Sequence, residues 1–202
     1  MSTRSLTMRQ CGISLIELII FIVIISIALT AILLVMNVIT RSSADPVVHK
    51  QALAIAESLL EEVELMPFTY CDPDDASAVI ATSSLGCAAT PEGMGPETIA
   101  GVKEDRYGSP APSAVNAYFD NVNDYNGFSM AAGAVLDINK TAAVSGYAAS
   151  VAVTPVRLLG IAATDANGAP QVLQITVTVT GPDGVPILLD GYRTRYAPNS
   201  VP

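Results

Sequence analysis

Near its amino terminus the chain reads Arg9-Gln10-Cys11-Gly12-Ile13-Ser14-Leu15-Ile16-Glu17-Leu18. Gly12 ends a short basic leader, and an almost unbroken apolar run then extends to about Ile39, with one acidic residue, Glu17, near its start. A carboxylate inside a membrane-spanning segment costs roughly 2.5–3.5 kcal/mol, so its presence there indicates a function. The alternative is an interfacial residue whose side chain extends to the water at the cytoplasmic end. We infer that the partner of Glu17 is a free α-amino group, which appears only after the chain is cut behind Gly12.

The apolar run is long enough to cross a membrane. Leu18–Met36 contains 19 residues without a charge, and a hydrocarbon core of ~30 Å needs about 20 helical residues. Backbone polar groups in lipid must be satisfied within their own segment, so we predict a helix over Ile13–Ile39. The leader carries Arg4 and Arg9 and no acidic residue, which keeps it on the cytoplasmic side. An ordinary secretory signal is cut after its apolar stretch, whereas the predicted cut here precedes it, so the anchor stays on an exported chain.

Charge excludes one class of function. The 202-residue chain has a formal net charge of −9, and removing the leader takes away two arginines. An acidic polypeptide of this kind lacks the basic patch that non-specific nucleic-acid binding requires. We therefore expect no nucleic-acid partner.

The three cysteines are Cys11, Cys71 and Cys87. Cys11 lies in the leader, so the exported part keeps an even pair, which favours a Cys71–Cys87 disulfide formed in an oxidising compartment. The alternative is two unpaired buried thiols. The enclosed stretch, about 16 residues, is rich in turn-forming residues, and closing a loop of that length contributes ~3 kcal/mol in the chain-entropy model.

A second, amphipathic helix is predicted beyond the membrane segment. Asp45 is expected to cap its start, with Pro46 at the first helical position, and Pro67 is expected to stop it. The alternative is that the two helices are continuous over Ile13–Met66, with a kink at Pro46. Helical spacing marks an apolar face at Ala52, Ile55, Ala56, Leu59, Leu60 and Val63. The other face carries Glu57, Glu61, Glu62 and Glu64, which we interpret as a solvated face or a subunit contact.

The remainder of the chain favours β-structure in its second half. Phe68–Met130 is irregular, with loops, short strands and one short helix expected. Tyr147–Ile161 is predicted to form a strand that Pro155 limits to an edge or a bend. Strict alternation of apolar residues with Gln and Thr over 173–180 is the strongest strand signal. The turn at 181–184 leads back into Pro186–Tyr196, so we predict a hairpin whose apolar face covers the amphipathic helix. The predicted fold class is α+β, with a long N-terminal helix packed on an antiparallel sheet.

Together these residues resemble the type IV pilin and pseudopilin family. The resemblance rests first on the cleavage and methylation motif at 12–18, then on Ser43-Ala44-Asp45-Pro46 and residues 51–62. With residues 119–128 and 189–196, the chain resembles an accessory (minor) pilin of the mannose-sensitive haemagglutinin type. It departs from the family pattern at Ile13, where Phe is usual.

The resemblance implies a processing route and a set of partners. A prepilin peptidase cuts between Gly12 and Ile13 and methylates the new amino terminus at Ile13, and Glu17 then attracts the terminal amine of a neighbouring subunit. The implied partners are major and minor pilin subunits, the peptidase, the inner-membrane assembly platform, and membrane lipid before assembly. The implied location is the bacterial inner membrane with a periplasmic domain, and then the pilus at the cell surface.

The expected organisation has four parts. Residues 1–12 form the cleaved leader, 13–40 the transmembrane and assembly helix, 41–67 the amphipathic helix, and 68–202 a periplasmic α+β domain. The expected function is that of a structural minor pilin without a cofactor or catalytic residues. The alternatives are a pseudopilin of a type II secretion system and a membrane-anchored periplasmic enzyme or binding protein. His49 is the only histidine and is read as an exposed helix residue, so the sequence contains no His-based catalytic triad or zinc site.

An acidic and amide cluster, Asp120-Asn121-Val122-Asn123-Asp124-Tyr125-Asn126, raises a calcium hypothesis, because hard cations prefer carboxylate and amide oxygens. Its weak candidate ligands are Asp120, Asn123 and Asp124. The spacing does not match a calcium loop, since Val122 stands where a first ligand is needed. We therefore interpret the segment as a solvated turn and expect no metal.

Overall fold

The computed structural model describes residues 12, 14–89, 91–99, 101–108, 117–133 and 135–201. The chain divides into two compact units, Met1–Pro46 and Val47–Pro202, and we call the second the head unit. Helix α1, Leu15–Leu65, contributes residues to both units. Each unit is described by itself.

The N-terminal unit contains the membrane-length part of α1. Leu15–Ile39 is long and apolar enough to span a membrane by length and composition, and none of this segment is buried by other described residues. Its hydroxyl groups are satisfied within the helix, because Ser26 donates to the Ile22 carbonyl at 2.7 Å and Thr30 to the Ser26 carbonyl at 2.8 Å. The segment therefore offers lipid or other helices an apolar surface without free side-chain donors at these two positions.

The predicted helix start at Asp45 is wrong. The structure assigns α1 as one helix that is already formed before Asp45 and includes Pro46. Proline has a backbone φ that suits a helix, so it removes one hydrogen bond without forcing the helix to end. The end near Pro67 is confirmed, because α1 finishes at Leu65.

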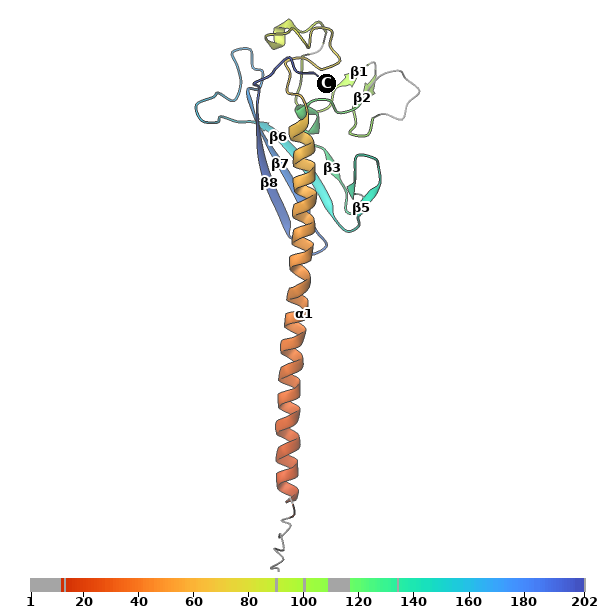
Figure 1. Cartoon of the computed structure of the whole chain (residues 1–202), viewed down its shortest axis with the longest axis vertical. Coiled ribbons are helices and arrows are strands. Elements are labelled where there is room, and N and C mark those ends of the chain that lie inside the picture. The colour runs from red at the N-terminus through yellow and green to blue at the C-terminus, as the bar shows by residue number, and fades with distance from the viewer. Residues whose placement is uncertain are drawn as a thin grey trace, which may run out of the picture. The chain divides into compact units, whose positions relative to one another are not determined.

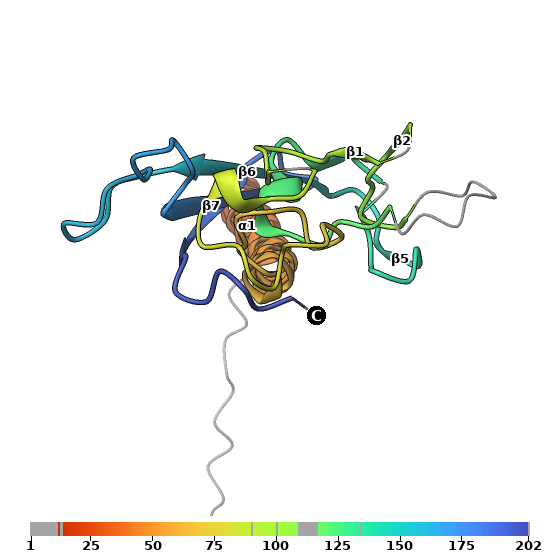
Figure 2. The same cartoon turned by 90° about the horizontal axis from the view of Figure 1, so that it is seen from above.

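The head unit is built on an antiparallel four-stranded sheet in the order β3-β6-β7-β8. Its strands are β3 (Ser129–Met130), β6 (Ala148–Pro155), β7 (Val172–Thr180) and β8 (Pro186–Thr194). Figure 1 shows β6, β7 and β8 side by side along the C-terminal part of α1, and Figure 2 shows the same group from above. The predicted hairpin is confirmed, with Ile175 opposite Gly191, and so is the α+β fold class.

The core lies between the sheet and the apolar face of α1. From the helix it contains Ala52, Ala56, Leu59, Leu60 and Val63, and from β7 it contains Leu173, Ile175, Val177 and Val179. The alternation in β7 therefore places its apolar residues on the helix-facing side. Gly191 allows β8 to approach α1 closely, because a Cβ there would lie 2.8 Å from Leu60 Cδ1.

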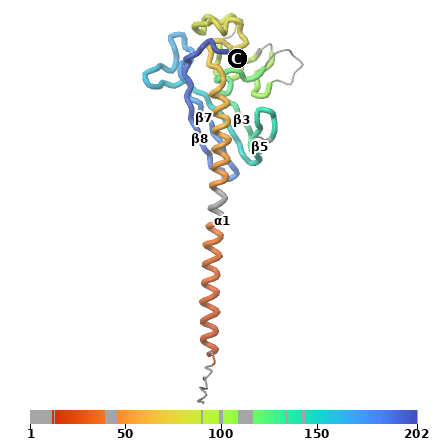
Figure 3. Tube along the Cα trace, viewed as in Figure 1, coloured from red at the N-terminus to blue at the C-terminus, as the bar shows by residue number. Residues whose placement is uncertain are grey.

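Short elements connect the helix to the sheet. They are the 3-10 helices η1 (Ser84–Gly86) and η2 (Val122–Tyr125) and the strands β1 (Thr98–Ile99), β2 (Val102–Lys103), β4 (Val135–Leu136) and β5 (Ala142–Val144). Strands β1 and β2 pair with each other, as do β4 and β5. Residues 68–89 lie at the end of the head unit where α1 finishes (Figure 3). Pro155 is the last residue of β6, at a strand end as its ring requires.

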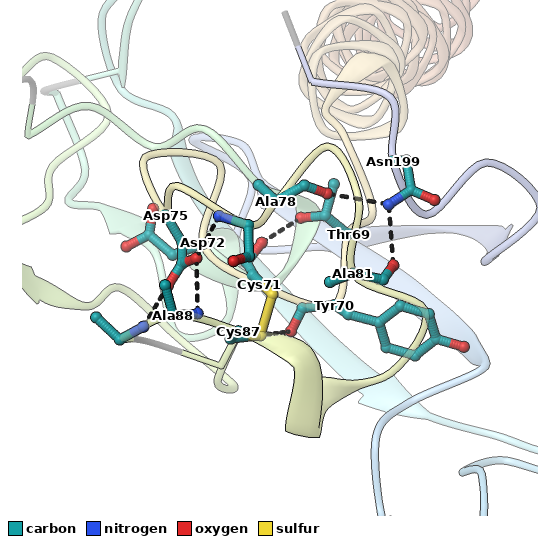
Figure 4. The surroundings of a disulfide bond; sticks show 12 residues. Thr69, Tyr70, Cys71, Asp72, Asp75, Ala78, Ala81, Cys87, Ala88 and Asn199 are labelled. Atoms are coloured by element: carbon teal, nitrogen blue, oxygen red, sulfur yellow. Dashed lines mark hydrogen bonds between the residues drawn. A yellow bond between two sulfur atoms is a disulfide. The ribbon is translucent and has the colours of Figure 1, made fainter.

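The loop after α1 is closed by a Cys71–Cys87 disulfide with a Cα–Cα distance of 5.4 Å. Its interior is supported by hydrogen bonds, since Asn199 Nδ2 donates to the carbonyls of Ala78 at 3.1 Å and Ala81 at 2.9 Å (Figure 4). Cys71, Ala78 and Ala81 are buried together in a small second core. This core has few apolar atoms, so a covalent link contributes a large share of the loop's stability.

We predict that replacing both cysteines by Ser lowers the free energy of unfolding by ~3 kcal/mol, because the open loop has more conformations in the unfolded chain. Urea unfolding of the full-length protein in detergent measures the change. Wild-type protein treated with reductant is the matched control and should show the same loss. Equal stability of the oxidised wild type and the double variant would contradict the prediction.

Candidate functional site

Gly12 is exposed, and no described atom lies within 4 Å of a Cβ built at this position. Nothing in the described part of this chain therefore demands glycine at position 12. A requirement for glycine has to come from a molecule that binds this segment, such as an enzyme that needs close access to the backbone. The geometry is compatible with a cleavage site.

The predicted cut and methylation at Ile13 lie outside the described residues, as does the leader before Gly12. The structural information on the site therefore begins with Gly12 and Ser14. Leu18 N–H donates to the Ser14 carbonyl at 3.1 Å, so the helical hydrogen bonding starts directly after the predicted junction.

Glu17 lies in the first turn of α1, on the positive end of the helix dipole. A carboxylate in that place gains typically 0.3–1 kcal/mol, which is smaller than the roughly 2.5–3.5 kcal/mol that it costs in a bilayer. The ion pairs among the described residues are His49–Asp183 and Glu62–Arg106, so no described basic side chain pairs with Glu17. The helix dipole alone does not offset the cost of placing the Glu17 carboxylate in a bilayer. A cation supplied by another molecule would offset it.

A buried ion pair in the head unit was missed by the sequence analysis. Arg106 is 5% exposed, and its Nε donates to Glu62 Oε1 at 2.6 Å while its Nη1 donates to the Leu136 carbonyl at 3.0 Å. Tyr125 Oη also donates to Glu62 Oε1, at 2.8 Å. Burial lowers the pKa of the Arg106 guanidinium, but the hydrogen bond and the charge of Glu62 raise it by more. The net shift is upward, so the guanidinium stays charged.

The interpretation of all four helix glutamates as a solvated face is therefore wrong for Glu62. Glu57 and Glu61 are exposed as expected, and Glu64 is half-buried. Glu62 follows Leu59 by three residues, which places it beside the apolar stripe rather than opposite it. This spacing was the signal in the sequence that Glu62 lies partly buried. It does not identify Arg106 as the partner.

The segment 120–126 is also not a solvated turn. Asn121, Asn123 and Asp124 are at most 1% exposed. Asp124 Oδ2 accepts from the backbone N–H of Asn121 at 2.8 Å and of Asp120 at 3.0 Å, which caps η2. Asn121 Nδ2 donates to Thr69 Oγ1 at 2.8 Å, and Asn123 Nδ2 donates to the Gly93 carbonyl at 2.6 Å. Polar side chains are buried here because they connect η2 to two other loops.

The fold does not place the weak calcium candidates Asp120 and Asp124 in the same group of possible ligands. Asp120 groups with Asp72 and Asp74, whereas Asp124 groups with Glu92 and Glu97. His49 is half-buried rather than exposed, with its Nε2 3.7 Å from Asp183 Oδ2 in the turn between β7 and β8. Neither arrangement resembles a hydrolytic active site.

An exposed apolar N-terminal helix, followed by a head with an antiparallel four-stranded sheet, is a pilin-like α+β arrangement. Residues 7–33 match the family model described as the prokaryotic N-terminal methylation motif. The chain carries the motif of a type IV pilin-like prepilin. Comparisons with curated proteins and with solved structures found no match.

We predict that Glu62→Gln lowers the free energy of unfolding by about 3 kcal/mol, because it leaves the buried Arg106 charge without its carboxylate. Glu61→Gln makes the same chemical change at an exposed position of the same helix and should alter stability by less than about 0.5 kcal/mol. Urea unfolding of both full-length variants in detergent measures the difference. Equal effects of the two substitutions would contradict the role given to Glu62.

Proposed function

We propose that this chain is a structural minor pilin, cut after Gly12, methylated at Ile13 by a prepilin peptidase, and incorporated into a type IV pilus of the mannose-sensitive haemagglutinin type. The observation that carries the proposal is the methylation motif at 7–33 at the start of an exposed apolar helix with Glu17 in its first turn. The protein acts by assembly and has no catalytic role.

The proposal gives the apolar helix two successive environments. Before assembly, lipid covers Leu15–Ile39, and in the fibre the corresponding helices of other subunits cover it. Transfer between the two does not expose the segment to water, so the hydrophobic effect does not oppose assembly. The methylation motif and the carboxylate in the first turn of the helix support a role as a fibre subunit, because a simple anchor needs neither.

Glu17 gives assembly its specificity in this proposal. Cutting the chain after Gly12 creates a positive amine at Ile13, and the amine of one subunit pairs with Glu17 of its neighbour. Opposite charges attract far more strongly in a medium of low dielectric than in water. Pairing also removes the penalty that each unpaired charge carries when it is buried alone.

The head unit remains outside the cytoplasm in this scheme. Residues 1–12 are the removed leader, 13–40 the membrane and assembly helix, 41–67 the amphipathic helix, and 68–202 the periplasmic domain. The Cys71–Cys87 disulfide supports an oxidising compartment. The partners are other major and minor pilins, the peptidase and the inner-membrane assembly platform.

Deletion of the gene tests the function, since a type II secretion pseudopilin would share the same motif. We expect fewer surface fibres, measured by shearing and electron microscopy, with secretion of exoproteins unchanged. Complementation with the wild-type chain is the control and should restore the fibres. Loss of exoprotein secretion with normal piliation would contradict the proposal and favour a pseudopilin.

We predict that Glu17→Leu permits membrane insertion but reduces the amount of this subunit in sheared fibres at least tenfold, because the neighbouring amine loses its counter-charge. Glu17→Gln should have the same effect, because it keeps the side-chain size and removes only the charge. Ile16→Leu is the matched control and should be incorporated normally. Immunoblots of membrane and fibre fractions measure the ratio, and wild-type incorporation of both Glu17 variants would remove the proposed role.

A further inference from the structure

Four carboxylates from three separate segments of the head unit gather next to η2. Glu92 and Glu97 precede β1, Glu104 follows β2, and Asp124 lies in η2. Glu92, Glu97 and Asp124 each have a carboxylate oxygen within 4.8 Å of the oxygens of the other two. Glu104 is tied to the same group, because its Oε2 accepts from the Glu97 backbone N–H at 3.1 Å.

Several oxygen atoms in this group are buried without a donor. Asp124 is 1% exposed and Glu104 is 4% exposed, yet Asp124 Oδ1 and Glu104 Oε1 accept no hydrogen bond, and neither does the buried Glu92 Oε1. The amide oxygen of Asn123, which is fully buried in the same 3-10 helix, also has no donor. Unpaired buried polar atoms are costly, so this concentration of them requires an explanation.

Among the described residues, no basic side chain forms an ion pair that would explain these unpaired oxygens. The ion pairs there join Glu62 to Arg106 and His49 to Asp183, and none includes the four carboxylates. The group therefore lacks positive charge, and a bound cation would supply it.

We propose that Glu92, Glu97, Glu104 and Asp124 form a calcium site that links the segment 92–104 to η2. Ca²⁺ takes six to eight oxygen ligands at 2.3–2.6 Å, so oxygens on opposite sides of the ion lie about 5 Å apart. The 4.8 Å limit within the group fits this span. Mg²⁺ binds at 2.0–2.1 Å in a strict octahedron, which a looser group drawn from separate loops suits less well.

The site has access from solvent. Glu104 and Asp124 both line a surface cavity of about 280 Å³, which Lys103 and Phe128 also border. Lys103 is exposed, so its ammonium group can remain in water when an ion enters. The second acidic group, Asp72, Asp74 and Asp120, contains none of the unpartnered buried oxygens, and we assign no ion to it.

Calcium binding by the full-length protein in detergent, stripped with EDTA and titrated by calorimetry with CaCl₂, tests the assignment. We expect one ion per chain with a Kd between about 10⁻⁷ and 10⁻³ M, the range that calcium sensors and extracellular modules span together. MgCl₂ should bind at least tenfold more weakly. Absence of saturable calcium binding by the wild type would overturn the proposal, and equal affinity for magnesium would overturn the assignment to calcium.

Three variants locate the site. Glu92→Gln should weaken calcium binding at least tenfold, because it removes a ligand charge with little change in shape. Asp74→Asn in the second acidic group and Glu61→Gln on the exposed face of α1 remove the same charge elsewhere and should change the Kd by less than twofold. An equal loss in Asp74→Asn would overturn the location. If Glu92→Gln fails to fold, the wild-type unfolding midpoint decides, because it should rise with CaCl₂ and not with MgCl₂ at equal concentration.

Discussion

Leu15–Ile39 forms a predominantly apolar helical segment of 25 residues that no other described part of the chain covers. At 1.5 Å per residue this segment is about 37 Å long, which exceeds the ~30 Å hydrocarbon core of a bilayer. This segment is therefore not stable when it is exposed to water, and it needs to be covered by lipid or by other apolar helices. Every functional argument for this protein depends on that constraint, because it restricts the chain to a membrane or to an assembly of similar helices.

One helix serves two different surroundings. In Leu15–Ile39 apolar side chains occur on all sides, as a lipid-facing or fibre-forming segment requires. In the head unit only one face of α1 is apolar, and Ala56 and Val63 pack on the sheet. Glu62 binds Arg106 beside this face, so the helix is connected to the loops by a charged contact as well as by packing. The change in pattern along one helix therefore matches the change in what covers it.

The regular parts of the fold were predictable because they depend on local patterns. The alternation over 173–180 specifies β7, the turn at 181–184 specifies the hairpin, and the spacing from Ala52 to Val63 specifies the buried helix face. Likewise, the methylation motif was readable from the sequence, and the family-model match at 7–33 includes Gly12 and Glu17. These signals lie within a few residues of one another, so a single sequence is enough to read them.

The missed features depend on contacts between distant residues. The Glu62–Arg106 pair spans 44 positions, and local polarity gives Glu62 no preference for that partner. Segment 120–126 looks like a solvated turn because it is polar, but Asn121 and Asn123 are buried by the loops that they bind. The group around Asp124 joins three segments, and its membership follows from tertiary structure alone. Asp45 was misread because a proline within a helix resembles one at a helix start.

Amino-terminal sequencing of this subunit, recovered from sheared fibres, tests the account most directly. We predict a chain that begins at Ile13 with a methylated amine, because in the proposed assembly removal of the leader creates the amine that pairs with Glu17 of a neighbouring subunit. A fibre-derived chain that begins at Met1 would contradict it, since the amine would then lie 16 residues from Glu17 in sequence.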